Sequence, residues 1–468
     1  KIMSEIKVNK ISPRTACGTT TLGDSGDTFT IPAGVTITNS GTAAGFGATG
    51  AASWDTTVKT TGFTAVSGVG YFVNTTAGAI TVTLPASPSA GDVVAVSDYA
   101  GTADTNNITI GRNGSNINGA AADLTVAQEN SAVTLVYVDG TQGWKATDTS
   151  SLTDLELQPA YITATGGNTI ITCGNFKIHK FTGPGTFAVS CAGNASGSTL
   201  VDYLVVAGGG GGGWDRAGGG GAGGFRESPG TASGSYSVSP LGTSPAVALS
   251  VPVASYPIAV GGGGTNGNDV TGNGSDGTNS SFSSITSAGG GGGGTAPGNA
   301  DGRAGGSGGG TSGPSSSAGS GNTPPVSPSQ GFPGGTSPAP GGNNHGGGGG
   351  GATAAGNPGD GPLNPGTTAS NGGAGATTSI SASPTAYAGG GGGGFSSAGS
   401  GCSPFPGGAG GTGGGGAGGT YPSGEGTAGT INTGGGGGGG SNGTTTSPSS
   451  DGGSGGSGIV IIRYKFQN

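Results

Sequence analysis

Uninterrupted glycine runs fill the second half of this chain and constrain its fold more than any other feature. The first run covers residues 208–213 and the last covers residues 434–440. Between them, separated by segments rich in Ser, Thr, Pro and Asn, lie the runs at residues 218–221, 261–264, 289–294, 346–351, 389–394 and 413–416. These eight runs and seven spacers predict a bundle of glycine rods joined by loops.

Apolar segments at both ends of this region argue against a flexible linker, although Gly/Ser-rich chains commonly behave as one. Residues 203–206 precede the first run, and residues 458–466 follow the last. Both segments are rich in β-branched and aromatic residues and need to be buried. The spacers also carry aromatic residues, which disordered segments lack. We therefore expect an ordered region whose apolar ends clamp the runs together.

Ordered polyglycine has few structures available to it. Each glycine in a helix costs about 1 kcal/mol relative to alanine, and a glycine sheet has no side chains to pack. The remaining option is an extended three-fold helix of polyproline II type, whose backbone groups bond to neighbouring strands. Ordering a residue costs about 1–2 kcal/mol, whereas one hydrogen bond returns about 0.5–1.5 kcal/mol. We therefore predict one cooperative polyglycine-II bundle over residues 203–468.

Composition and charge disfavour several functional classes. Only 8% of the 468 residues are charged and 117 are glycine, so a large conventional core is not expected. The net charge of −8 disfavours a nucleic-acid partner. No stretch is apolar enough for membrane insertion. The four cysteines, which form no C-x-x-C pair, and the two histidines predict neither a metal site nor a cofactor.

The first part of the chain divides into a short segment and a β module. Residues 1–53 hold brief alternating stretches that are too small to fold alone, which predicts an oligomerising attachment segment. Residues 54–149 contain strand-like runs with a turn signal about every ten residues and no helical period. This pattern predicts a β module, either sandwich-like or a β-prism, with Trp54 and Trp144 in its core.

Residues 150–202 are interpreted as a linker followed by a small β unit. Residues 150–159 have linker composition. In the β unit, His179 lies on the strand face opposite to Phe176 and Ile178, so we expect it at an exposed position. The redox state of Cys173 and Cys191 stays open, with reduced thiols as the default.

Two parts of the first 150 residues resemble phage tail proteins. Residues 3–14 (MSEIKVNKISPR) and 26–34 (GDTFTIPAG) look like the N-terminus of tail-fibre-type proteins of phages that infect marine cyanobacteria. Residues 71–85, 91–94 and 133–138 resemble a β module that recurs in phage tail proteins. The resemblance places the N-terminal segment on virion tail or neck proteins.

The glycine-rich region is similar to the C-terminal domain of phage fibres, on the strength of residues 203–207, the glycine run and residues 458–464. It also resembles the tip adhesins of T-even-type phages, in which polyglycine helices stack in layers and the connecting loops bind the bacterial surface. The resemblance implies an all-β homotrimer of fibrous modules with the glycine-rich bundle distal. It further implies a cell-surface polysaccharide or outer-membrane protein as receptor, and a virion location after assembly in the host cytoplasm.

Receptor-binding residues are expected in the spacers, because loops on a rigid scaffold carry recognition. Aromatic rings give amphipathic contact area to sugars or protein loops. The candidates are Trp214, Phe225, Tyr256, Phe332, His345, Phe395, Phe405 and Tyr421. The alternative, that these rings cap the runs or pack between layers, stays open.

A tail fibre that adsorbs to the host surface is the favoured function. The alternatives are a fibre attached to the neck or head, a purely structural glycine-rich protein, an ice-binding protein and a polysaccharide-degrading tailspike. Ice-binding faces need a regular tripeptide repeat, which the spacers lack. A tailspike needs two carboxylates about 5–10 Å apart. The acids of residues 203–468 are scattered, so we predict no catalytic residue and no enzyme.

Overall fold

The computed structural model describes residues 52–148, 155–157 and 159–468, the last range with gaps at 235, 297–300, 314, 338–344, 360–369, 396–405, 423 and 443–449. The predicted attachment segment therefore lies almost wholly outside the described residues, as do Cys17, Cys402 and the candidate Phe405. The described residues contain strands and turns without a helix, which confirms the all-β prediction. It follows that no helix in the described ranges could cross a bilayer.

The β module is a sandwich of two five-stranded sheets, ordered β1-β3-β5-β8-β9 and β10-β7-β6-β4-β2. Its strands are β1 (Ser53–Lys59), β2 (Phe63–Thr64), β3 (Val69–Val73), β4 (Ile80–Thr83), β5 (Val93–Asp98), β6 (Ile108–Gly111), β7 (Leu124–Val126), β8 (Ala132–Asp139), β9 (Gly143–Asp148) and β10 (Leu155–Leu157). Alternating residues point between the sheets, and Val82, Leu135 and Trp144 are fully buried there.

Two expectations about this module need correction. Trp54 is not in the core: its side chain is 43% exposed, because it lies on the outer face of the edge strand β1. The expected linker also contributes a strand, since β10 pairs antiparallel with β7. A short apolar stretch flanked by polar residues gives no sequence signal that separates an edge strand from a linker.

The second β region, called the cap here, consists of two sheets ordered β11-β14-β18-β19-β20 and β12-β13-β23-β15-β16, with β17 beside β15. Its strands are β11 (Ile162–Thr165), β12 (Thr169–Cys173), β13 (Phe176–Phe181), β14 (Gly185–Ala192), β15 (Leu200–Val206), β16 (Phe225–Glu227), β17 (Leu249–Ser250), β18 (Ser255–Ala259), β19 (Ser280–Phe282), β20 (Ile285–Ser287) and β23 (Ile459–Lys465). A small hairpin, β21 (Ala376–Thr378) with β22 (Thr385–Tyr387), packs its buried residues into the same core. Residues 160–202 are thus part of the cap rather than a separate unit.

The two apolar segments that bound the glycine runs pair with each other. Strands β15 and β23 are antiparallel neighbours at the centre of their sheet, with Val206 opposite Ile459. Both strands are buried on both faces, one toward each apolar cluster of the cap. The expected clamp at the ends of the runs is therefore confirmed.

His179 is fully buried, so the expectation of an exposed position was wrong. Its strand, β13, lies inside a sheet that is covered on both faces, which alternation along one strand cannot reveal. Nδ1 lies 2.7 Å from the carbonyl oxygen of Gly166 and must donate to it. Nε2 then accepts from the Tyr464 hydroxyl at 3.1 Å. Burial lowers the pKa of this imidazole below its usual value.

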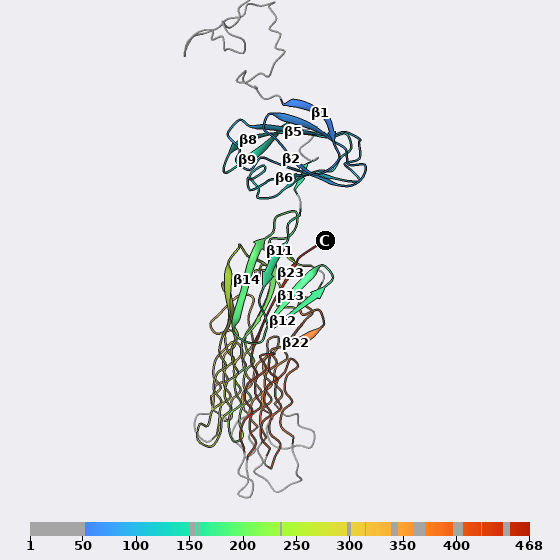
Figure 1. Cartoon of the computed structure of the whole chain (residues 1–468). Helices are drawn as coiled ribbons and strands as arrows, with labels where there is room; N and C mark the ends of the chain where they lie inside the picture. The colour runs from blue at the N-terminus through green and yellow to red at the C-terminus, as the bar shows by residue number, and fades with distance from the viewer. Residues whose placement is uncertain are drawn as a thin grey trace, which may run out of the picture.

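The glycine-rich segments run lengthwise, side by side, away from the cap (Figure 1). In the run at residues 208–213, amides three residues apart donate to the same neighbouring segment, over 2.8 to 3.1 Å. The bonds are Gly208 N to Thr278 O, Gly211 N to Ser275 O, Gly209 N to Gly456 O, Gly212 N to Gly453 O, Gly210 N to Gly221 O and Gly213 N to Gly218 O. The carbonyls of this run accept from three further segments with the same period. One run is thus surrounded by six neighbours.

The spacers supply much of this bundle. Thr278 and Ser275, which accept hydrogen bonds from the first run, come from a spacer that the sequence suggested was a loop. The prediction of rods joined by free loops was therefore too simple. Short polar segments return along the runs, because any residue can occupy a position whose Cβ faces outward.

Glycine is required at the inner positions by the close approach of neighbouring backbones. A Cβ built on Gly210 would lie 2.2 Å from the carbonyl oxygen of Gly291, and one on Gly220 would lie 2.1 Å from that of Gly210. Real Cβ atoms do not approach so closely. At Gly262, on the outside, the nearest atom would be 3.9 Å away. Closely packed inner positions such as Gly210 and Gly220 therefore require glycine.

Cys173 and Cys191 are both free thiols in this structure. Cys173 ends β12 and Cys191 lies in β14, and these strands belong to different sheets.

Candidate functional site

The end of the bundle opposite the cap, called the distal end here, is formed by turns between glycine segments. The first is the distal turn, residues 214–217, which joins the first two runs and is closed by the bond from Gly213 N to Gly218 O (3.1 Å). The runs lead lengthwise away from the cap (Figure 1). The distal turn is therefore held far from the cap by a rigid pair of segments.

The backbone of the distal turn is fixed by segments remote in sequence. Trp214 N donates to Gly272 O at 2.9 Å, and Ala217 N donates to Gly440 O at 3.0 Å. The hydroxyl of Thr295 donates to the carbonyl of Trp214. Both Asp215 and Arg216 have left-handed backbone conformations, with φ of 54° and 53°. Such conformations are uncommon for residues other than glycine and persist where surrounding contacts hold them.

An ion pair lies within the distal turn. Arg216 Nη2 is 3.4 Å from Asp215 Oδ2, and the Asp215 side chain is largely buried. Burial raises the pKa of the Asp215 carboxyl, partly offset by the guanidinium of Arg216. The turn therefore presents one carboxylate, one guanidinium and the indole of Trp214 together at the distal end.

The candidate aromatic residues fall into two groups. Trp214, His345, Phe395 and Tyr421 lie at the distal end. His345 and Phe395 are 3% and 5% exposed, and their ring centroids are 4.2 Å apart, so these two rings pack against each other. Tyr421 is half-buried, beside the turn closed by Gly424 N and Thr420 O.

The other three described candidates lie at the cap end. Phe225 is 1% exposed in β16 and is part of the apolar core. Tyr256, in β18, is half-buried, and its hydroxyl donates to Pro252 O at 3.0 Å. Phe332 is 37% exposed and donates its amide to Gly351 O, close to the cap. The structure thus gathers only part of the predicted set at one place.

Asp215 and Arg216 were missed as binding candidates. The sequence carries a usable signal for them. The spacer between the first two runs is only four residues long, yet it contains both an acid and a base beside a tryptophan.

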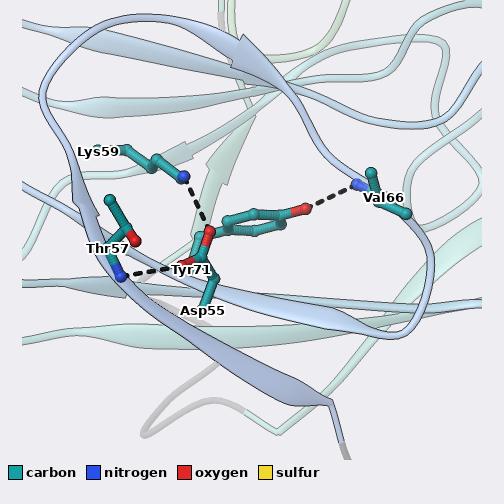
Figure 2. Close-up of polar contacts among 5 residues, drawn as sticks. All are labelled: Asp55, Thr57, Lys59, Val66 and Tyr71. Atoms are coloured by element: carbon teal, nitrogen blue, oxygen red, sulfur yellow. Dashed lines mark hydrogen bonds and ion pairs between the residues drawn. The ribbon is translucent and has the colours of Figure 1, made fainter. Parts of the chain in front are cut away.

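A second exposed aromatic residue lies at the edge of the β module. The Trp54 ring lies flat over Gly70, where a Cβ would come within 2.8 Å of the indole, and stacks on Phe72 with centroids 4.8 Å apart. Figure 2 shows polar contacts made by Asp55, Thr57 and Lys59 of this edge strand and by Tyr71 of β3. Asp55 pairs with Lys59 at 2.9 Å, and this contact lowers the pKa of Asp55 to about 2.

The Tyr71 hydroxyl accepts a hydrogen bond from Val66 N at 2.9 Å (Figure 2). The Lys59 ammonium lies 5.8 Å from the centre of the Tyr71 ring. These contacts fix the connection between β1 and β3, so the Trp54 surface is rigid.

Two buried carboxylates in the cap have structural partners. Asp202 is fully buried and accepts from Ser228 Oγ (2.7 Å), Ser233 N (2.7 Å) and Ser233 Oγ (2.6 Å). Glu227 is 2% exposed, and its oxygens accept from Ser239 N and Thr378 Oγ1. Arg463 lies opposite Asp202 across the strand pair, with its guanidinium over the rings of Phe176 and Tyr236. These donors occupy the carboxylates, which therefore stabilise the cap.

Comparison with known proteins places the glycine-rich region in a family. No curated protein matches the chain. A family described as a glycine-rich domain matches residues 181–465. The match begins within β13 and ends at the last residue of β23, so it takes in most of the cap and the whole bundle. It covers more than half of the sequence, and the chain therefore belongs to the glycine-rich domain family.

Proposed function

We propose that this chain is a fibre protein of a phage virion that recognises the host surface with the distal end of its glycine bundle. One observation carries the proposal: the distal turn, with Trp214, Asp215 and Arg216, is held rigidly at the end of an elongated bundle. Recognition residues are typically placed on turns of rigid scaffolds. The resemblance of residues 3–14 to phage tail-fibre proteins is the reason for assigning this fibre to a phage virion.

We further propose that the glycine segments are polyglycine-II helices. The three-residue period of donors and acceptors in residues 208–213 supports this, because such a helix has three residues per turn and bonds only to its neighbours. The six neighbours around one run fit a hexagonal array of these helices.

A homotrimer is proposed for the whole chain. Support comes from the outer face of the β module, where the exposed Trp54 lies with Gly70 and Phe72. Each chain carries a net charge of −8, so copies of the chain repel one another. We therefore expect them to associate through apolar surface such as that around Trp54. Light scattering on the purified chain should give three times the mass of one chain, and Trp54→Ser should shift this mass toward the monomer.

Host recognition is tested with the full chain labelled fluorescently and applied to a panel of marine cyanobacterial strains. We expect saturable binding to some strains, and competition with phage adsorption to the same strains. Absence of saturable binding throughout the panel would favour a purely structural fibre. Immunogold electron microscopy of virions then separates attachment at the tail from attachment at the neck or head.

A further inference from the structure

We propose that the distal turn binds an uncharged, hydroxyl-rich saccharide through the side chains of Trp214, Asp215 and Arg216. This inference rests on the proposed role of the distal end in host recognition and names the ligand class. Its basis is a set of buried polar atoms that have no hydrogen-bond partner among the described residues.

Three consecutive residues each bury a polar atom that makes no hydrogen bond within the described part of the chain. These atoms are Trp214 Nε1, Asp215 Oδ1 and Arg216 Nε. Asp215 as a whole residue is 8% exposed, and its side chain is 11% exposed. Buried polar groups in native proteins are nearly always paired, so three in one turn require an explanation.

Three of the four backbone amides of the same turn donate hydrogen bonds to other segments, in contrast to its side-chain atoms. Trp214 N, Asp215 N and Ala217 N donate to Gly272, Ser450 and Gly440 respectively. Asp215 and Arg216 are adjacent in the sequence, and both have left-handed backbone conformations. Strain and unmatched polar groups are typical of sites that are complementary to a ligand rather than to themselves.

The chemistry of the three atoms selects the ligand class. Trp214 Nε1 and Arg216 Nε are donors, whereas Asp215 Oδ1 is an acceptor. A hydroxyl group can satisfy both kinds at once, because it donates to the carboxylate and accepts from an N–H group. A vicinal diol would therefore match the turn.

Charge disfavours the other classes. Asp215 and Arg216 lie 3.4 Å apart and neutralise each other. A phosphate or uronate would meet the Asp215 carboxylate, and an amine would meet the Arg216 guanidinium. The indole of Trp214 offers an apolar surface for the C–H face of a sugar ring.

Access requires movement of side chains only. The Arg216 side chain is 31% exposed and Trp214 is half-buried, so both lie at the surface. The three polar atoms are enclosed in the unbound turn, and hydroxyls reach them when these two side chains rotate outward. The backbone stays in place because its amides remain bonded to neighbouring segments.

The test uses the full chain and envelope polysaccharide extracted from cells that the chain binds. We expect this polysaccharide to compete with cell binding. Mild periodate treatment, which cleaves vicinal diols, should abolish the competition. Trp214→Phe, which keeps the ring and removes the N–H, and Asp215→Asn, which suits the left-handed backbone, should each weaken binding roughly tenfold.

Ile431→Ala is the control, because this side chain is 70% exposed and belongs to the same bundle near its cap end. Its binding should be unchanged. All variants must retain the thermal melting of the parent, and Trp214→Phe keeps the test valid if Asp215→Asn fails to fold. Full binding by both turn variants would overturn the inference and leave host recognition standing.

Two further outcomes separate the inference from the function on which it rests. Cell binding that no extracted polysaccharide competes with would point to a protein receptor and overturn the saccharide assignment alone. Failure of the full chain to bind any cells would overturn both.

Discussion

The β module and the glycine bundle fill their interiors by different means. In the module, apolar side chains such as Leu135 and Trp144 fill the space between two sheets. In the bundle, the carbonyl oxygen of one segment occupies the space where a neighbouring glycine would carry its Cβ. A methyl group therefore stabilises one region and disrupts the other.

This difference also sets the cooperativity of each region. A sandwich can lose one side chain and keep its ladder of hydrogen bonds. The run at residues 208–213 bonds to six segments, and those segments bond to one another. Because each hydrogen bond returns little net free energy, the segments can be stable only together. The substitutions below are ordered from the largest expected effect to the smallest.

Gly210→Ala should have the largest effect. The added Cβ would lie 2.2 Å from Gly291 O, which the packed backbone cannot avoid. We expect a loss of more than about 3 kcal/mol in the unfolding free energy of the bundle. Gly262→Ala is the control, because its Cβ meets nothing closer than 3.9 Å. Urea unfolding of both variants makes the comparison. Equal effects would mean that the interior of the bundle is not close-packed.

Leu135→Ala tests the other region. Leu135 is fully buried in the module, and truncation should cost about 3 kcal/mol. The effect should be confined to the module, leaving exchange of the bundle amides unchanged in peptide-resolved hydrogen exchange. Val66→Ala, at a position 62% exposed, should be nearly neutral. A matching loss in the bundle would show that the two regions unfold as one.

Asp202→Asn probes the polar cluster of the cap. The carboxylate accepts three hydrogen bonds from Ser228 and Ser233, and an amide can accept only part of them. We expect a loss of about 2 kcal/mol, measured by thermal or urea unfolding of the cap and bundle. Asp269→Asn, at an exposed distal position, is the control. An unchanged stability would contradict the structural role assigned to Asp202.

His179 should give the smallest effect, and one that depends on pH. Burial lowers the pKa of its imidazole in the folded chain, so below about pH 6.5 the unfolded chain binds a proton that the folded chain does not. Stability is therefore present above that pH and falls on acidification, by at most about 1.4 kcal/mol per pH unit. His179→Gln should remove this slope when urea midpoints at pH 7.5 and 5.5 are compared. An identical slope in the variant would assign it to other groups.

The sequence was informative where the signal is local. Apolar residues 203–206 and 458–466 had to be buried, and they pair as β15 and β23. Alternation and turns indicated an all-β module with Trp144 in its core. These inferences need only the chemistry of adjacent residues.

The remaining features depend on contacts between distant residues. Trp54 was expected in the core and His179 at the surface, yet their exposures are the reverse, because the layers that cover a strand come from elsewhere in the chain. The sequence also did not indicate that spacers join the bundle, since Gly208 N donates to Thr278 O, a spacer residue far along the chain. Phe225 became part of the core for the same reason.

Native-state hydrogen exchange of the glycine amides tests the central claim most directly. If the bundle is one cooperative unit, the amides of residues 208–213 and 218–223 should exchange only with global unfolding, at the same free energy as those of β15 and β23. Exchange of these amides within seconds, while β15 and β23 stay protected, would mean that the glycine runs are flexible chain, and it would remove the rigid support on which the distal turn depends.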